Sequence, residues 1–301
     1  MQQRQTGHML STYFAPRGHG RMSALGMQIA QLYLSPFDKL IGIIGEAGSG
    51  KSALIRGMFP GLELTNDDNG VYVRPLPILE QDQNVAFFSP HTYHVDIRFE
   101  TGFTQLSAIV DAITLALHRG KRVVVEHFDL IYEQLGMNAD LLIGVGEEIV
   151  ITRPTIFGPK PQEIYDIVYA SLPYRLMSHT AEDLCELFMS KEDIDRCGHA
   201  DVKHGFVLTF PDSPPDIDLV ELEQKVYGLI EQNLPITYKD ENHVCIGDMV
   251  HYCTGPRIHV SSTGMVKDFY LLHRFLYDPF SKCYLLVGCL GKENLDNIRH
   301  Q

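Results

Sequence analysis

The stretch Leu40–Ser52, LIGIIGEAGSGKS, decides the fold of this 301-residue chain. Its apolar first part predicts a short buried strand, and the glycine-rich part after it ends in Lys51-Ser52. A glycine, four residues and then Gly-Lys-Ser form the pattern of a phosphate-binding P-loop. Glycines allow such a loop to turn its N–H groups inward, and the following helix offers further unpaired N–H groups to phosphate oxygens.

This loop predicts a nucleotide site that uses ATP and Mg²⁺. The expected phosphate-binding residues are Gly45, Glu46, Ala47, Gly48, Ser49, Gly50, Lys51 and Ser52. Lys51 is expected to reach the terminal phosphates and to act in catalysis, while the Ser52 hydroxyl is expected to hold the magnesium ion.

The composition is that of an ordinary globular chain with room for about two domains. Hydrophobic residues make up 45% and charged residues 21%, and the net charge of −13 argues against a broad nucleic-acid surface. The sequence has no signal-peptide pattern and no apolar run as long as a membrane span. Its six cysteines include no Cys-x-x-Cys pair. We therefore expect a cytoplasmic protein with reduced thiols and no membrane partner.

Two acidic segments follow the loop. Gly61–Thr65 predicts a second strand that runs into Asn-Asp-Asp-Asn-Gly, where Asp67 or Asp68 is expected to contact a phosphoryl acceptor; the alternative is a plain turn. Arg122–Asp129 predicts a buried strand that reaches Glu126, the place of a Walker-B-type catalytic carboxylate. The alternative for Glu126 is a surface carboxylate.

Strand and helix patterns alternate over the first half of the chain. The apolar positions of residues 106–117 follow a helical period, and residues 140–146 predict another buried strand. This alternation predicts an α/β domain with a doubly wound parallel sheet over residues 1–160. The proline-rich stretch Pro154–Pro161 predicts a linker, after which residues 161–301 form a second domain.

This layout resembles the uridine kinase and phosphoribulokinase branch of P-loop kinases. The resemblance rests on the P-loop, the acidic residues 66–70 and the segment RVVVEHFDLIYEQLGMNADLLIGV, and it covers about residues 38–150. Members of that branch carry an arginine-rich lid helix after the last strand, whereas this chain has only Arg153 and Lys160 nearby. The resemblance implies nucleotide binding. The arginines that stabilise the transferring phosphoryl group in that branch have no counterparts in this segment.

The second half contains a pair of residues with metal-ligand spacing. His179 and Asp183 lie four apart, on one face of a predicted helix. The alternative is an ordinary capped helix start. Near the N-terminus, Arg17 and Arg21 fall in a turn-rich stretch, where solvated loop charges are expected and phosphate contacts are the alternative.

The order of motifs in this half resembles the second additional domain of threonyl- and alanyl-tRNA synthetases, an α+β editing domain. The matching segments are HTAED, DVKHGFVLTF, DIDLVELEQKVYGLIEQNLPI and GDMVHYCTGPRIHVSSTG, within about residues 172–275. The resemblance implies a Zn²⁺ set of His179, Asp183, Cys253 and His259, with Asp183 standing where the family has its second histidine. Arg257 occupies the family spacing of the last histidine, so His259 requires a two-residue displacement.

Three functions fit these patterns. The first is a kinase-like phosphotransferase or ATPase that uses Lys51, Asp67 and Glu126 on a small-molecule acceptor or an aminoacyl-tRNA-like ligand. The second is an editing-type hydrolase of misacylated tRNA that acts through His179, Cys253 and His259. The third is a regulatory module in which ATP changes the binding of a partner without catalysis.

Overall fold

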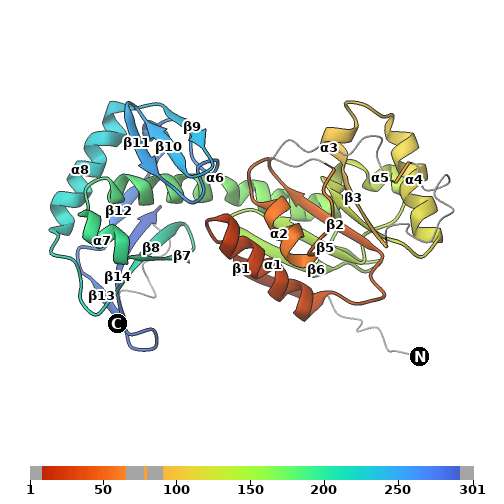
Figure 1. The fold of residues 1–301 in the computed structure, drawn as a ribbon, viewed down its shortest axis with the longest axis horizontal. Helices are drawn as coiled ribbons and strands as arrows, with labels where there is room; N and C mark the ends of the chain where they lie inside the picture. Colours follow the sequence, from red (N-terminus) through yellow and green to blue (C-terminus); the bar gives the residue numbers. More distant parts are fainter. Residues whose placement is uncertain (1–8, 66–77, 80–90, 292–301) are drawn as a thin grey trace. The chain divides into compact units, whose positions relative to one another are not determined.

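The computed structural model describes residues 9–65, 78–79 and 91–291. The chain divides into two compact units, unit 1 (Met1–Tyr13 and Gly20–Ala170) and unit 2 (Phe14–His19 and Ser171–Gln301) (Figure 1). None of the helices in the described part of the chain combines the length and the apolarity that crossing a lipid bilayer requires.

Unit 1 is built on a six-stranded sheet in the order β1-β6-β5-β2-β4-β3. Its strands are β1 (Met9–Phe14), β2 (Leu40–Gly45), β3 (Thr92–Asp96), β4 (Arg122–Glu126), β5 (Leu141–Val145) and β6 (Glu148–Arg153). The neighbours β3, β4, β2 and β5 pair in parallel, whereas β6 runs antiparallel to β5. The sheet is therefore mixed.

The prediction of a parallel sheet is wrong at β6. Only Gly146 and Glu147 separate β5 from β6, and the Gly146 N–H donates to the Glu148 carbonyl oxygen at 3.0 Å. So short a connection reverses the chain, because a parallel pair needs a crossover of a dozen or more residues. The strand predicted over Gly61–Thr65 is also not formed, since these residues adopt turn and irregular structure.

The central strand β2 is buried along its whole length, which explains its continuous apolar sequence. Leu40 and Ile44 join one core cluster with residues of β4 and of α4 (Leu106–His118). Ile41 and Ile43 point to the opposite face and are also fully buried. Both faces of the sheet are therefore covered.

The remaining helices of unit 1 lie between these strands. They are α1 (His19–Tyr33), α2 (Lys51–Met58), α3 (Ile97–Glu100), the 3₁₀ helix η1 (Phe128–Leu130) and α5 (Tyr132–Leu135). The long helix α6 (Pro161–Glu186) begins in unit 1 and ends in unit 2. The sequence placed the domain division between residues 160 and 161, after the proline-rich stretch, whereas the two compact units divide inside α6, after Ala170.

Helix α1 packs closely against α2 through glycine. A Cβ atom added to Gly26 would lie 2.3 Å from the Leu54 carbonyl oxygen, and one added to Gly57 would lie 2.0 Å from the Ser23 carbonyl oxygen. Both obstacles are backbone atoms, so neither can move aside alone. The two helices approach each other at a distance that only glycine permits.

We expect Gly26→Ala to lower the free energy of unfolding by about 1–3 kcal/mol, because the new methyl group forces α1 away from α2. Gly20→Ala on the same helix is the matched control, since a Cβ there meets nothing within 4 Å. The control should be neutral or slightly stabilising. Urea unfolding of both variants tests this, and equal stabilities would show that the close approach is unimportant.

Unit 2 combines the end of α6 with two antiparallel sheets (Figure 1). One sheet has the order β11-β10-β9, and the other has the order β12-β14-β8-β7 with β13 paired to β14. The elements are α7 (Lys191–Arg196), β7 (Gly198–Val202), β8 (Gly205–Pro211), α8 (Leu219–Gln232), β9 (Ile236–Asp240), β10 (His243–Ile246), β11 (Met249–Tyr252), the 3₁₀ helix η2 (Thr263–Met265), β12 (Phe269–Leu271), β13 (Leu276–Asp278) and β14 (Cys283–Leu290).

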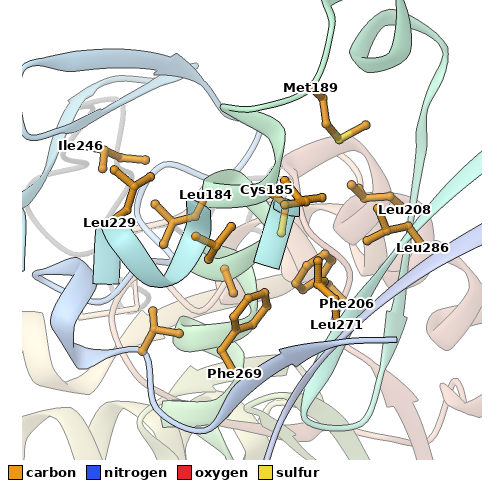
Figure 2. Packing of buried hydrophobic residues seen from close by; sticks show 14 of the residues in the cluster. Leu184, Cys185, Met189, Phe206, Leu208, Leu229, Ile246, Phe269, Leu271 and Leu286 are labelled. Atoms are coloured by element: carbon orange, nitrogen blue, oxygen red, sulfur yellow. The ribbon is translucent and has the colours of Figure 1, made fainter. Parts of the chain in front are cut away.

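The larger of two buried clusters in unit 2 joins its helices and its sheets. Leu184 and Cys185 of α6 join Leu208 of β8, Leu229 of α8 and Leu286 of β14 in one buried cluster (Figure 2). The other face of the same stretch of α6 carries charged side chains. Because these leucine and cysteine positions anchor the helix, the charged face is held at a fixed orientation within the unit.

Candidate functional site

In unit 1, chemically active side chains gather where three adjacent parallel strands end. Glu126 of β4 pairs in register with Ile43 of β2 and with Asp96 of β3. The carboxyl ends of parallel strands form the ligand-binding edge of open α/β sheets. The P-loop sequence connects β2 to α2 at this same edge.

The loop between β2 and α2 has the backbone that its glycines predict. Gly48 has φ +78° and Gly50 has φ +93°, and α2 begins directly after Gly50. L-residues with side chains rarely adopt these angles, so glycine is required at both positions. The first N–H groups of α2 consequently face the loop rather than a preceding helical turn.

Lys51 is the buried cation of this site. Its Nζ atom donates a hydrogen bond to the Glu46 carbonyl oxygen at 2.8 Å and lies 3.5 Å from Oε2 of Glu126. Burial acts to raise the pKa of Glu126, but the hydrogen bond from His94 and the charge of Lys51 lower it to about 2. Glu126 is therefore ionised and next to Lys51, as a Walker-B-type carboxylate would be.

His94 of β3 orients Glu126. The Thr65 backbone N–H donates to Nδ1 of His94 at 3.0 Å, so this nitrogen must carry a lone pair. The proton of the neutral ring then lies on Nε2, which donates to Oε1 of Glu126 at 3.0 Å. The hydrogen bond from Thr65 thus fixes the tautomer of His94, and the Nε2–H group of this tautomer orients the Glu126 carboxylate.

A buried group of donors adjoins Lys51. Asp96, Glu126 and His127 each place one donor atom within 4.8 Å of the others. His127 follows β4 with φ +57°, an uncommon conformation for a residue with a side chain. Burial and the Lys51 charge lower the pKa of His127 to about 4, so its ring is neutral. The two carboxylates supply oxygen ligands of the kind that Mg²⁺ prefers, and Ser52 follows Lys51 in the first turn of α2.

Arg98 of α3 is a second cation at the loop between β2 and α2. Its guanidinium donates to Oε1 of Glu46 at 2.6 Å and to the Tyr169 hydroxyl at 3.4 Å. Burial opposes ionisation of Glu46, but the Ala47 N–H and the Arg98 guanidinium lower its pKa to about 2. Both side chains remain well exposed, so Arg98 is accessible to an anionic ligand at the loop.

Arg153 is not a substitute for the missing lid arginines. It donates to both carboxylate oxygens of Asp38 at 2.7 and 2.8 Å and to the Asp140 carbonyl oxygen at 3.2 Å. Asp38 precedes β2 and Asp140 precedes β5, so Arg153 lies at the amino ends of these strands, opposite the P-loop. Asp67 and its alternative Asp68, the residues predicted to contact an acceptor, fall outside the described residues.

The second cluster lies on the polar face of α6 in unit 2. His179, Glu182, Asp183 and Glu186 recur at helical spacing, and each is at least nine-tenths buried. Arg17, itself 3% exposed, donates to Oε2 of Glu182 at 2.7 Å and also contacts Asp183 and the Cys253 sulfur, the latter at 2.8 Å. The expectation of solvated loop charges is therefore wrong for Arg17. A buried arginine is stable here because two carboxylates compensate its charge.

Three of the four predicted zinc ligands come together. Asp183, Cys253 and His259 place donor atoms within 4.8 Å of one another, and Nε2 of His259 lies 2.8 Å from Oδ2 of Asp183. His179 belongs to no such group in the described chain. Because the Arg17 guanidinium already contacts Asp183 and Cys253, an ion bound by these three donors requires Arg17 to move.

The protonation of this cluster disfavours a cysteine nucleophile. Burial and the Asp183 charge raise the pKa of the Cys253 thiol to about 12. Burial and the Arg17 charge hold the pKa of His179 well below its usual range, so its ring is neutral. A protonated thiol is a weak nucleophile.

The sequence patterns gave no site role to His94 or His127, and they favoured a solvated loop charge for Arg17. Glu126 could be identified from the sequence, because it ends a β-branched strand downstream of the P-loop pattern. His94 and His127 become interpretable only once β3 and β4 are known to be neighbours. Arg17 lies more than 160 residues from its carboxylate partners along the chain, and no local pattern links them.

The sequence matches no protein-family model and no curated protein. The two family resemblances therefore remain expectations drawn from the motifs, and function has to be argued from the geometry of the sites.

Proposed function

We propose that unit 1 is a P-loop nucleotide-binding domain of doubly wound type that binds ATP with Mg²⁺ and acts as a kinase-like phosphotransferase or ATPase. The observation that carries the proposal is the position of Lys51 between the Glu46 carbonyl oxygen and Glu126, at the edge where β2, β4 and β3 end. The left-handed glycines and the first turn of α2 add the backbone donors that a triphosphate requires.

The residues at this edge fit a magnesium ion. Ser52, Asp96 and Glu126 would hold it directly or through water, since Mg²⁺ takes oxygen ligands and keeps several waters. The ion would neutralise charge on the phosphate oxygens. Lys51 would exchange its contact with Glu126 for a phosphate oxygen, and His94 would keep the freed carboxylate in position.

Arg98 supports phosphoryl chemistry at this site. Phosphoryl transfer depends on positive charge around the transferring group, and the chain has no lid arginines after β6. The exposed Arg98 guanidinium contacts Glu46 within the loop itself, so it can turn from this carboxylate to a phosphate oxygen. An unidentified small molecule or an aminoacyl-tRNA-like ligand would be the acceptor.

Isothermal titration of the full chain with ATP, with and without Mg²⁺, tests this function. We expect Glu126→Gln to retain metal-free nucleotide binding and to lose the increase in affinity that Mg²⁺ gives to the wild type. Asp129→Asn is the matched control, because Asp129 lies three residues further along and belongs to no donor group in the described residues. No ATP binding by the wild type, or an unchanged Mg²⁺ effect in Glu126→Gln, would refute the proposal.

Editing-type hydrolysis remains the alternative for unit 2, and the clustering of Asp183, Cys253 and His259 is the observation in its favour. Cys253 would not act as a thiolate nucleophile in this reaction, because burial keeps its thiol protonated. Deacylation of Ser-tRNA or Ala-tRNA that is unchanged in Cys253→Ala would count against a role for this cluster.

A further inference from the structure

Beside the cluster around Arg17, a second set of donors lies at the end of α6. Glu186, Cys197 and His199 place one donor atom each within 4.8 Å of one another. None of the three belongs to the zinc set that the sequence predicts. The set is independent of the nucleotide site, which is built entirely from unit 1.

Local backbone structure explains how Cys197 and His199 face the same carboxylate. Cys197 follows the last turn of α7 with an extended backbone, φ −75° and ψ 142°, and β7 begins at the next residue. Residues two apart in an extended segment project to the same side. A Cys-x-His pair in a strand therefore directs a sulfur and an imidazole toward Glu186, the last residue of α6.

Glu186 has an unused oxygen in this group. Its Oε2 atom lies 3.2 Å from Nε2 of His251, while its buried Oε1 atom has no hydrogen-bond partner among the described residues. Oε1 lies 3.6 Å from Nδ1 of His199, too far for a hydrogen bond. Glu186 itself is only 5% exposed. A buried carboxylate oxygen without a donor is costly unless a cation or a ligand satisfies it.

The charge around this oxygen also favours a cation. Glu182, Asp183 and Glu186 are three buried carboxylates on one face of α6, and Arg17 forms hydrogen bonds to Glu182 and Asp183. His199 is held by Oε1 of Glu182 at 2.8 Å. The contact uses Nδ1 of His199, which also lies 3.6 Å from Oε1 of Glu186. Glu182 would therefore orient the ring if Nε2 binds the ion, and would be a further oxygen donor if Nδ1 binds it.

We propose that Glu186, Cys197 and His199 bind a divalent transition-metal ion of the zinc class, with Glu182 orienting or completing the site. Sulfur, imidazole and carboxylate donors suit Zn²⁺, whereas Mg²⁺ and Ca²⁺ take oxygen ligands. Donor atoms around a tetrahedral zinc ion lie roughly 3.5 Å apart, so closure of this group needs movements of only about 1 Å. Cys197 and His199 are partly exposed, which lets an ion enter from solution.

Cobalt(II) titration of the untagged, chelator-treated full chain tests this site, because a cobalt–thiolate bond absorbs in the near ultraviolet. We expect Cys197→Ser to remove the thiolate absorption and to weaken the binding of Co²⁺ at this site by at least about tenfold. Cys245→Ser is the matched control, since Cys245 is also half-buried and belongs to no donor group in the described chain. This control should bind Co²⁺ as the wild type does.

Two further variants keep the outcome decisive. Cys253→Ser removes the sulfur of the Asp183 group, so absorption that survives in it and is lost in Cys197→Ser assigns the ion to the proposed site. Absorption that survives in Cys197→Ser and vanishes in Cys253→Ser would overturn the proposal, as would the absence of any thiolate absorption in the wild type. His199→Gln guards against misfolding: in the metal-free state it should melt as the wild type does, and Zn²⁺ should raise its Tm less. An equal rise would also overturn the proposal.

Discussion

Lys51→Ala is expected to weaken Mg·ATP binding by roughly 10- to 150-fold, which corresponds to about 1.5–3 kcal/mol for a hydrogen bond to a charged group. Turnover should fall further, by about 10²- to 10³-fold, because Lys51 would stabilise charge that develops on the transferring phosphate. Titration calorimetry and release of radiolabelled phosphate measure the two effects. Wild-type affinity in Lys51→Ala would show that the loop does not hold the triphosphate.

Lys160→Ala is the control for this experiment. Lys160 is exposed and lies among the cations that follow β6, where the kinase resemblance places a lid. We expect its removal to change neither binding nor turnover. An effect equal to that of Lys51→Ala would mean that general positive charge, and not the loop lysine, attracts the nucleotide.

A change in stability must be separated from the change in binding, because Lys51→Ala leaves the buried Glu126 without its cation. The double variant Lys51→Ala/Glu126→Gln removes that unpaired charge and should regain stability in urea unfolding. It should not regain nucleotide affinity. Recovery of both properties together would indicate that Lys51 acts only through folding.

The sequence predicted the parts of unit 1 whose structure is set by neighbouring residues. The buried run of β2, the glycines before α2 and the strand ending at Glu126 each follow from local pattern, and the structure contains each of them. The helix predicted over residues 106–117 appears as α4. The direction of β6 was missed because it depends on one tight turn.

The sites were harder to predict, because their contacts join neighbouring strands of the sheet or residues that are far apart in the sequence. Glu126 was identified, but its partner His94 depends on the register between β3 and β4. The sequence pattern singled out only His179 and Asp183 on this part of α6, because the burial of the charged face and its contact with Arg17 depend on residues far apart in the chain. Glu182 and Glu186, four residues apart, lie on this same face of α6.

Arg17→Met is expected to destabilise unit 2 by about 3–5 kcal/mol, because it removes the one guanidinium seen to contact both Glu182 and Asp183 and leaves these carboxylates buried. Hydrogen exchange of the chelator-treated full chain, read on peptides of α6 and β8, reports this loss in unit 2. Arg274→Met is the control: Arg274 is exposed in the same unit, and its removal should change stability by less than about 0.5 kcal/mol.

The stability lost in Arg17→Met should depend on pH, and the lowered pKa of Asp183 sets the direction of this dependence. Burial opposes ionisation of Asp183, but the Arg17 and His259 charges hold its pKa far below the usual range. A lowered folded-state pKa contributes stability above the unfolded value of about 3.9, and this contribution is lost as the pH falls below that value. The difference between wild type and Arg17→Met should therefore be largest near neutral pH and shrink below about pH 4.

A double variant separates lost charge from lost packing. Arg17→Met/Asp183→Asn replaces the buried charged partner with a neutral amide of similar size, so it should recover part of the stability lost in Arg17→Met at neutral pH. If the two changes instead add independently, Arg17 stabilises unit 2 through its hydrocarbon stem. A pH-independent loss equal to that of Arg274→Met would refute the ion pair altogether. Partial recovery would establish that the positive charge of Arg17 stabilises the buried carboxylates of α6.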